Sequence, residues 1–167
     1  MIVLRMHRVL IHFLKNLEME LVDIGKIIET VVSLNRKFFE KEGMQIKLNI
    51  PTELPTYGNK DQLEQVFMNL VLNAQAAMER GGVLEVKGWL DKDEIITQFI
   101  DTGCGIPPEQ MNKIFDPFFS TKVNGTGLGL FVSYGIIQSH NGIIEVDSKV
   151  NVGTTFTIRL PSEQPAQ

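Results

Sequence analysis

The chain has 167 residues, which suits one domain with a short appendage and one good hydrophobic core. Its formal net charge is -4, and its 16 Lys and Arg residues are scattered among 20 Asp and Glu residues, which disfavours nucleic-acid binding. The single cysteine, Cys104, excludes an internal disulfide and a cysteine-rich zinc site and suits a reducing cytosol.

Residues 1 to about 18 predict a helix with an apolar seam typical of a coiled coil or helical bundle, or alternatively a helix that packs on its own domain. The seam consists of Val3, Met6, Leu10, Phe13 and Leu17. Arg5, His7 and Arg8 interrupt the apolar run too early for a signal peptide or membrane anchor. We therefore expect no membrane contact from this segment and a cytoplasmic location, even where a longer parent protein is membrane-anchored.

Two amphipathic helices are predicted in the first half of the chain. The first follows a connector at residues 18–21 and should cover one face of a sheet with the stripe Ile24, Ile27, Ile28, Val31, Leu34 and Phe38. The second follows a loop at residues 51–58 and begins at Asn59, with a capping-box-like spacing to Gln62. It should bury Leu63, Val66, Phe67, Leu70, Ala74 and Met78 and end at Gly81-Gly82.

Alternating apolar residues predict the strands of a sheet, at residues 46–50, 83–90, 94–100, 143–146 and 155–160. A short helix is expected over residues 107–114. A longer helix is expected from Thr126 to His140, where Asn141-Gly142 supplies a left-handed turn. These elements predict an α/β (α+β) two-layer sandwich, in which a mixed, mainly antiparallel sheet carries about three helices on one face.

Asn69 and Asn73 lie one turn apart on the same side of the second helix. Asparagine is a poor helix former, so a pair in mid-helix favours a functional role over the alternative of tolerated, solvent-facing positions. An amide oxygen is a hard, neutral ligand of the kind that Mg²⁺ accepts together with phosphate oxygens and water.

Two glycine-rich segments predict the two ends of a nucleotide pocket. The run from Asp101 to Gly105 follows a strand, so it delivers a carboxylate at the edge of a sheet beside backbone that is free of side chains, which suits a flat heterocycle with an exocyclic amine. The run from Gly125 to Leu130 opens a helix, whose unpaired N–H groups and positive dipole end attract phosphate. Either cluster alone is also typical of ordinary tight turns, but the pair predicts ATP.

The order of these segments resembles the catalytic, ATP-binding domain of bacterial sensor histidine kinases, within the wider GHKL superfamily of gyrase, Hsp90 and MutL ATPases. The boxes are Asn69-Leu-Val-Leu-Asn73-Ala74, Asp101-x-Gly-x-Gly105, Phe115-Asp-Pro-Phe118-Phe119, Gly125-x-Gly-x-Gly129 and Gly153-Thr154-Thr155, and the match covers about residues 20 to 161. The resemblance implies a Bergerat-type ATP-binding fold, with ATP and Mg²⁺ as cofactors. It divides the chain into the end of a dimerisation helix with a linker (1–20), the catalytic domain (21–161) and a frayed tail (162–167).

The resemblance also implies a role for each site residue. Asn73 would offer its side-chain oxygen to Mg²⁺, Asp101 would accept a hydrogen bond from the adenine amine, and Thr154 would assist through an ordered water. Nucleotide contacts would further come from Gly103, Gly105, Ile106, Phe118, Lys122, Gly125, Thr126, Gly127, Leu128, Gly129 and Leu130. We name Lys122 and Asn69 as candidate catalytic residues. Lys122 would neutralise charge on the transferring phosphoryl group, although a solvated surface lysine is the alternative.

The acceptor of the phosphoryl group is expected elsewhere. In the resembling family the acceptor His lies on a dimerising helical hairpin and is usually followed by an acidic residue, and no His-Glu or His-Asp pair occurs in this sequence. His7 and His12 are therefore poor candidates, and we expect a fragment that begins downstream of the acceptor. The implied partners are that hairpin, from the same parent chain or a homodimer partner, and the receiver domain of a response regulator.

Two alternative functions stay open at this point. A GHKL-type ATPase clamp would hydrolyse ATP with a carboxylate one turn before the magnesium asparagine, where this chain has Asn69, whose amide cannot act as a general base. A regulatory nucleotide-binding module without transfer activity is the other alternative, because no acceptor is present.

Overall fold

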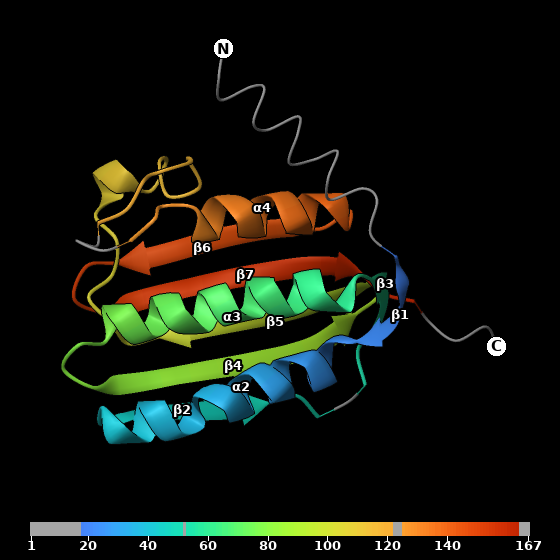
Figure 1. Ribbon diagram of the computed structural model, residues 1–167, viewed down its shortest axis with the longest axis horizontal. Coiled ribbons are helices and arrows are strands. Elements are labelled where there is room, and N and C mark those ends of the chain that lie inside the picture. Colours follow the sequence, from blue (N-terminus) through green and yellow to red (C-terminus); the bar gives the residue numbers. More distant parts are fainter. Residues whose placement is uncertain (1–17, 52, 122–124, 164–167) are drawn as a thin grey trace, which may run out of the picture.

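The computed structural model describes residues 18–51, 53–121 and 125–163 (Figure 1). The predicted N-terminal seam, Lys122 and the last four residues lie outside these ranges. In chain order the elements are β1 (Glu20–Asp23), α2 (Ile24–Lys41), β2 (Met44–Asn49), β3 (Pro55–Gly58), α3 (Lys60–Ala77), β4 (Gly82–Asp91), β5 (Glu94–Asp101), the 3-10 helix η1 (Pro108–Gln110), α4 (Gly129–Ser139), β6 (Ile143–Lys149) and β7 (Gly153–Pro161).

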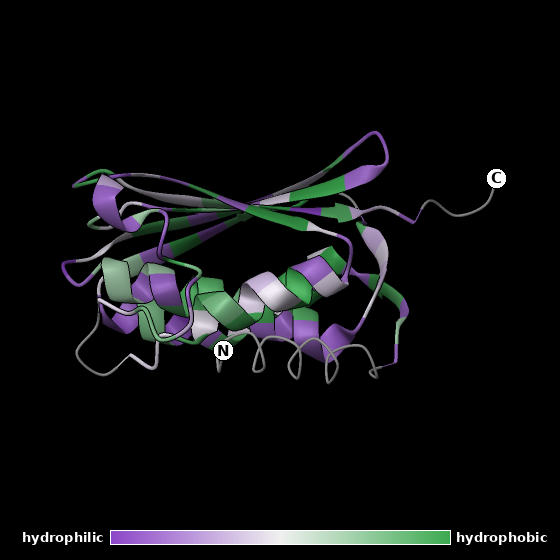
Figure 2. Cartoon of the chain, turned by 90° about the horizontal axis from the view of Figure 1, so that it is seen from above, coloured by the Kyte–Doolittle hydropathy of each residue, from purple (hydrophilic) through white to green (hydrophobic). Residues whose placement is uncertain are grey.

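The described residues form the predicted two-layer sandwich. Five strands make one sheet in the order β2-β4-β5-β7-β6, in which only β2 and β4 run parallel to each other. A parallel pair needs a crossover connection, and α3 supplies it. Figure 2 shows the sheet as one layer and α2, α3 and α4 as the other. The prediction of a mixed sheet with three helices on one face is therefore confirmed.

The hydrophobic core lies between the two layers. All the apolar residues predicted for the buried face of α3 are buried, and Phe67 of α3 stacks on Phe99 of β5 with ring centroids 5.7 Å apart. The outer face of the sheet is mostly polar, with Arg159 paired to Glu94 and Glu145, although Trp89 and Ile96 also lie there. One buried and one polar face is the usual state of an antiparallel sheet, and it explains the alternation in these strands.

The apolar stripe predicted for α2 is right over its first half and wrong at Leu34 and Phe38, which are exposed. After Val31 the buried line continues through Val32 and Phe39, which are seven residues apart and so lie on nearly the same side of the helix. Phe39, rather than its neighbour Phe38, therefore carries the contact with the sheet. Because Phe38 and Phe39 are adjacent and chemically identical, the local sequence does not indicate which of them is buried.

The connector and the loop predicted at residues 18–21 and 51–58 are partly wrong, because β1 and β3 pair there as a small antiparallel sheet. Each strand has four residues, too short for an alternating pattern to be recognised, and prolines at 51 and 55 favoured a loop. Asp23 is the last residue of β1 and the N-cap of α2. Its Oδ1 accepts hydrogen bonds from the N–H groups of Gly25 (2.9 Å) and Leu54 (3.1 Å).

Three predicted helix boundaries differ from the structure. Residues 107–114 contain only the short η1 followed by turns, α3 ends at Ala77 rather than at the glycines, and α4 begins at Gly129 rather than at Thr126. The late start of α4 follows from Gly127, whose φ of 68° is left-handed and breaks the helical backbone. The strands β6 and β7 are longer than predicted. The left-handed turn after α4 is confirmed, with φ of 57° at Asn141.

A junction at Asn59 joins three parts of the chain. Its Oδ1 accepts from the Gln62 N–H and caps α3, its Nδ2 donates to the Glu18 carbonyl, and its backbone N–H donates to Nε2 of His140, each at 3.0 Å. His140 lies at the end of α4, as predicted, and its Nδ1 is 2.7 Å from the Ile136 carbonyl. Because Nε2 accepts from the Asn59 N–H, the proton lies on Nδ1, which donates to the Ile136 carbonyl. Burial lowers the pKa of His140, and the bond to that carbonyl opposes the effect.

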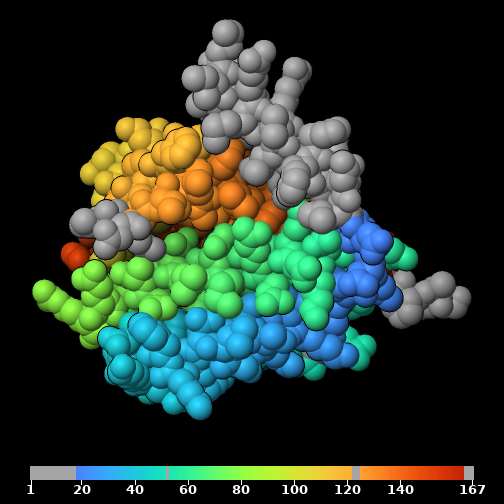
Figure 3. Space-filling view, viewed as in Figure 1, coloured from blue at the N-terminus to red at the C-terminus, as the bar shows by residue number. Residues whose placement is uncertain are grey.

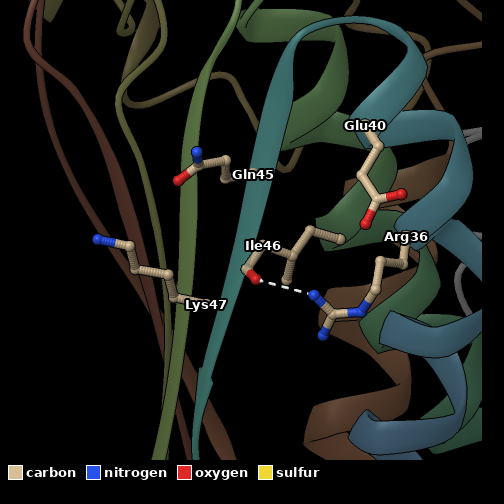
Figure 4. A pocket seen from close by; sticks show the side chains of 5 residues that line it. All are labelled: Arg36, Glu40, Gln45, Ile46 and Lys47. Carbon is tan, nitrogen blue, oxygen red and sulfur yellow. Dashed lines mark hydrogen bonds between the residues drawn. The ribbon is translucent and has the colours of Figure 1, made fainter.

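The β2 strand forms one edge of the sheet, beside the C-terminal part of α2. Nη1 of Arg36 donates to the outward carbonyl of Ile46 at 3.2 Å, and Glu40, Gln45 and Lys47 line the same shallow hollow (Figure 4). An occupied edge carbonyl blocks pairing with another strand, so this hollow protects the edge. None of the predicted nucleotide contacts lines it.

Candidate nucleotide-binding site

Three neighbouring strands bring three polar side chains together on the inner face of the sheet. Asp101 of β5 is opposite Thr154 of β7, and Thr154 is opposite Ser148 of β6. The same row continues on β4 and β2 with the apolar residues Leu84 and Ile46. Asp101 and Thr154 are only 7% and 5% exposed. A buried polar row that replaces an apolar one marks a site rather than core packing.

Asp101 carries the chemistry of this row. Its Oδ1 accepts from the backbone N–H of Gly103 at 2.8 Å and from that of Thr154 at 3.3 Å, whereas Oδ2 makes no hydrogen bond within the described residues. Burial raises the pKa of Asp101 above its ordinary value, and the two backbone hydrogen bonds oppose that effect. A buried carboxylate with one oxygen so fixed is oriented to accept a further hydrogen bond from a ligand.

The turn that follows Asp101 is held by the rest of the protein. Gly105 has a left-handed φ of 74°, and a Cβ there would collide with the carbonyl of Lys149. The N–H of Cys104 donates to the Ala77 carbonyl at the end of α3 (3.0 Å), and the N–H of Ile106 donates to Oγ of Ser148 (2.8 Å). From the sequence, a glycine at position 105 was attributed to the close approach of a base. The structure shows that the close approach of the Lys149 backbone already requires a glycine there.

The two asparagines of α3 face the opposite end of the site. Nδ2 of Asn69 donates to the carbonyl of Gly129 and to Oγ of Ser133, both at 3.1 Å, which ties α3 to the first turn of α4. A carboxylate could not donate these two hydrogen bonds. The contact between α3 and α4 therefore explains why position 69 has an amide side chain. Asn73 lies one turn further along α3 and is half-buried. Asn69 therefore lies beside Gly129 of the glycine-rich segment.

The Phe-rich segment meets the glycine-rich segment through its backbone. The N–H of Phe118 donates to the Gly127 carbonyl at 2.9 Å, and a Cβ on Gly127 would collide with the backbone of Phe118. Phe115 packs on Tyr134 of α4, but Phe118 has a φ of 65° and is 62% exposed. Phe118 is therefore not part of the core, because its left-handed backbone turns the side chain outward.

Other positions of the glycine-rich segment lie before and within the first turn of α4. Gly125 and Thr126 are exposed, and Oγ1 of Thr126 accepts from the Leu128 N–H at 3.4 Å. Gly129 and Leu130 begin the helix, which has no side-chain cap at Leu128. Figure 3 shows α4 next to α3 on the helical face of the molecule. A helix start without a side-chain cap leaves its first N–H groups for a ligand.

Sequence reasoning missed Ser148, which contacts both Ile106 and Thr154. A serine in an alternating strand carries no local signal. The register of β6 on β7 could have found it, because that register places Ser148 directly opposite the predicted site residue Thr154.

Neither a metal cluster nor a membrane-spanning helix is found in the described ranges. Among residues 18–51, 53–121 and 125–163, no group of three or more His, Cys, Asp or Glu side chains could hold a metal ion. In the same ranges, no helix combines the length and the apolar character that crossing a bilayer requires.

Residues 58–164 match the family described as histidine kinase-, DNA gyrase B- and HSP90-like ATPase. Sporulation kinase A of Bacillus subtilis is 36% identical over 152 residues, which cover 89% of this chain and 23% of that protein. The signal transduction histidine-protein kinase AtoS of Escherichia coli is 36% identical over 146 residues, covering 84% of this chain and 23% of that protein. The chain thus spans about a quarter of the length of these curated relatives.

A solved structure of the catalytic domain of histidine kinase ThkA superposes with a TM-score of 0.80 at 29% identity, covering 87% of this chain and 96% of that one. That solved structure is nucleotide-free. This chain therefore belongs to the histidine kinase-, DNA gyrase B- and HSP90-like ATPases and is an ATP-binding catalytic domain of the histidine kinase type.

Proposed function

We propose that this chain is the part of a sensor kinase that binds ATP and transfers the γ-phosphate to a His on a dimerising helical hairpin. The observation that carries the proposal is the buried row of Asp101 and Thr154 beside a helix start that Asn69 fixes in place. The hairpin would come from the parent chain or a homodimer partner, and a response regulator receiver domain would take the phosphoryl group onward. We place this reaction in the cytoplasm, and we assign residues 21–161 to the catalytic domain, 1–20 to the dimerisation helix and linker, and 162–167 to a tail.

The base would lie against the row on the sheet. Asp101 would accept from the adenine amine, while Gly103, Gly105 and Ile106 form the turn beside the base and Thr154 assists. The raised pKa of Asp101 supports this role, because a carboxylate that burial disfavours gains most from a ligand donor.

The phosphates would lie at the start of α4. The segment from Gly125 to Leu130 would offer backbone N–H groups, and the helix dipole adds attraction for anions. Phe118 would line this side of the pocket, supported by its hydrogen bond to Gly127. We also propose Lys122, which lies outside the described residues, as the cation that neutralises the transferring group.

The residues present fit magnesium. Mg²⁺ in nucleotide sites takes few protein oxygens and completes its octahedron with phosphate oxygens and water, so a single amide oxygen is enough. Asn73 supplies such an oxygen, and Asn69 one turn away is bonded to the helix start where the phosphates would lie. The metal would neutralise phosphate charge when bound.

Asn69 favours a kinase over an ATPase clamp. A clamp needs a general base at this position, and here the amide donates to Gly129 and Ser133 instead. The chain then supplies positioning and charge neutralisation, which are the main requirements of phosphoryl transfer. The nucleophilic imidazole comes from the hairpin.

The test of this function is incubation with γ-labelled ATP, with and without a helical hairpin that bears the family's acceptor His. We expect label on the hairpin, lost in acid as phosphohistidine is, and no label on His140 or elsewhere on the chain. Brisk hydrolysis without transfer would favour the clamp, and tight ATP binding with neither activity would favour a regulatory module.

Asn73→Ala should remove the contribution of Mg²⁺ to nucleotide binding and leave the contribution of the base unchanged. We expect ADP to bind the variant about as well as the parent without Mg²⁺, whereas added Mg²⁺ should no longer strengthen binding, because its protein ligand is gone. Titration calorimetry at several Mg²⁺ concentrations measures this. Gln65→Ala removes an exposed amide from the same helix and serves as the control. An equal magnesium benefit in the variant and the parent would move the metal ligand away from Asn73.

A further inference from the structure

Ser148 lies at the crossing of three backbone and side-chain contacts. Its Oγ is 2.8 Å from the N–H of Ile106, 3.0 Å from the carbonyl of Gly153 and 2.8 Å from Oγ1 of Thr154. It therefore connects the turn after Asp101 with the strands β6 and β7, which run side by side with β5 in Figure 1.

The positions of the protons in this cluster follow from the chemistry of each group. An amide N–H can only donate and a carbonyl can only accept, whereas a serine hydroxyl has one proton and two lone pairs. Ser148 therefore accepts from Ile106 and donates its own proton to Gly153. Its second lone pair is left for Thr154, so the Thr154 hydroxyl donates to Ser148. This is the arrangement that satisfies all three contacts.

A hydroxyl group whose one proton is already donated in a hydrogen bond can only accept further hydrogen bonds. Thr154 lies next to Asp101 across the β5–β7 pair, and its backbone N–H already donates to Oδ1 of that carboxylate. The side chains of Asp101 and Thr154 would thus offer a bound nucleotide acceptors and no hydroxyl donor. This arrangement suits an exocyclic amine or a water that donates, and it opposes a ligand carbonyl.

We propose that Ser148 is a positioning residue that sets base specificity by holding the Thr154 hydroxyl as a donor toward Ser148 and hence as an acceptor toward the ligand. This inference rests on the proposed nucleotide function and adds a residue that touches no ligand itself. Without Ser148 the Thr154 hydroxyl can turn and donate its proton to the carbonyl of a hypoxanthine or guanine base.

The test compares ADP with inosine diphosphate, in which a carbonyl replaces the adenine amine, by titration calorimetry on the whole chain. In Ser148→Ala we expect ADP affinity to fall about three- to tenfold, as loss of one hydrogen bond implies. The ratio of the two affinities should narrow by about threefold or more, because the freed hydroxyl can serve the carbonyl. Ser148→Thr, which keeps the hydroxyl, should restore the ratio.

The ratio distinguishes positioning from general damage. Lost packing or the unpaired N–H of Ile106 weakens both nucleotides alike and leaves the ratio unchanged, as should the control Ser139→Ala on α4. In a Thr154→Val background, Ser148→Ala should no longer alter the ratio. If Ser148→Ala does not fold by circular dichroism, the nearly isosteric Ser148→Cys is measured in its place.

The outcomes separate the two proposals. A parent chain that binds ADP and prefers it, combined with an unchanged ratio in the Ser148 variants, overturns the role of Ser148 and leaves the nucleotide function standing. A parent chain that binds neither nucleotide overturns the nucleotide function itself.

Discussion

Asp101→Asn should weaken ATP binding about tenfold to more than a hundredfold. The change puts a neutral amide where a buried carboxylate would face the adenine amine, and loss of a charge-assisted hydrogen bond costs about 1.5–3 kcal/mol. Titration calorimetry with ATP and GTP measures the effect, and the parent chain should bind GTP poorly. Unchanged ATP affinity in the variant would remove Asp101 from the base site.

The same substitution should leave the unliganded protein at least as stable as the parent at neutral pH. Burial raises the pKa of Asp101, so its contribution to stability is fully present below the ordinary pKa and is lost as the pH rises through the raised value. Asparagine removes that dependence. Thermal unfolding of both proteins between pH 7 and pH 4 checks it, and a variant that is less stable at pH 7 would show that the carboxylate is needed for folding.

Gly105→Ala should destabilise the fold and abolish nucleotide binding, and Gly43→Ala is its matched control. The two glycines have nearly equal φ values, 74° and 73°, but a Cβ at position 43 meets nothing within 4 Å, whereas at position 105 it meets the Lys149 carbonyl. The shared left-handed backbone should cost each variant about 1–2 kcal/mol. The collision should add about 1–3 kcal/mol at Gly105 alone.

Urea unfolding of the two alanine variants measures the difference directly. Gly43→Ala should keep the ADP affinity of the parent, because Gly43 lies between α2 and the edge strand β2, two strands away from Asp101 in the sheet, and its Cβ would meet nothing within 4 Å. Equal destabilisation of the two variants would show that the β6–β7 turn moves to make room for the added methyl group. The close contact at Gly105 would then not contribute to the free energy of unfolding.

The features that the sequence predicts well are those with a local cause. The buried face of α3 follows from helical spacing, and the turn from Asp101 to Gly105 follows from a strand that ends at a carboxylate and two glycines. Both can be recognised without knowledge of any other segment.

Features that depend on pairing between distant segments were not predictable. β1 and β3 are recognisable only once they pair, and the choice between Phe38 and Phe39 depends on how α2 rolls against the sheet. Ser148 gains its importance from a register with Thr154 that no single strand encodes. The early start predicted for α4 failed because the left-handed backbone at Gly127 is set by its contact with Phe118.

The junction at Asn59 has a mechanical consequence. α4 is bonded to α3 at both of its own ends, because the Asn59 N–H at the start of α3 donates to His140 and Asn69 in the middle of α3 donates to Gly129, so the two helices should move together. The described chain reaches this pair of helices at Glu18, whose carbonyl accepts a hydrogen bond from Nδ2 of Asn59. A displacement of Glu18 would therefore act on the start of α3 through this 3.0 Å bond. Because α3 is one continuous helix of 18 residues, it connects that bond directly with Asn69 and Asn73.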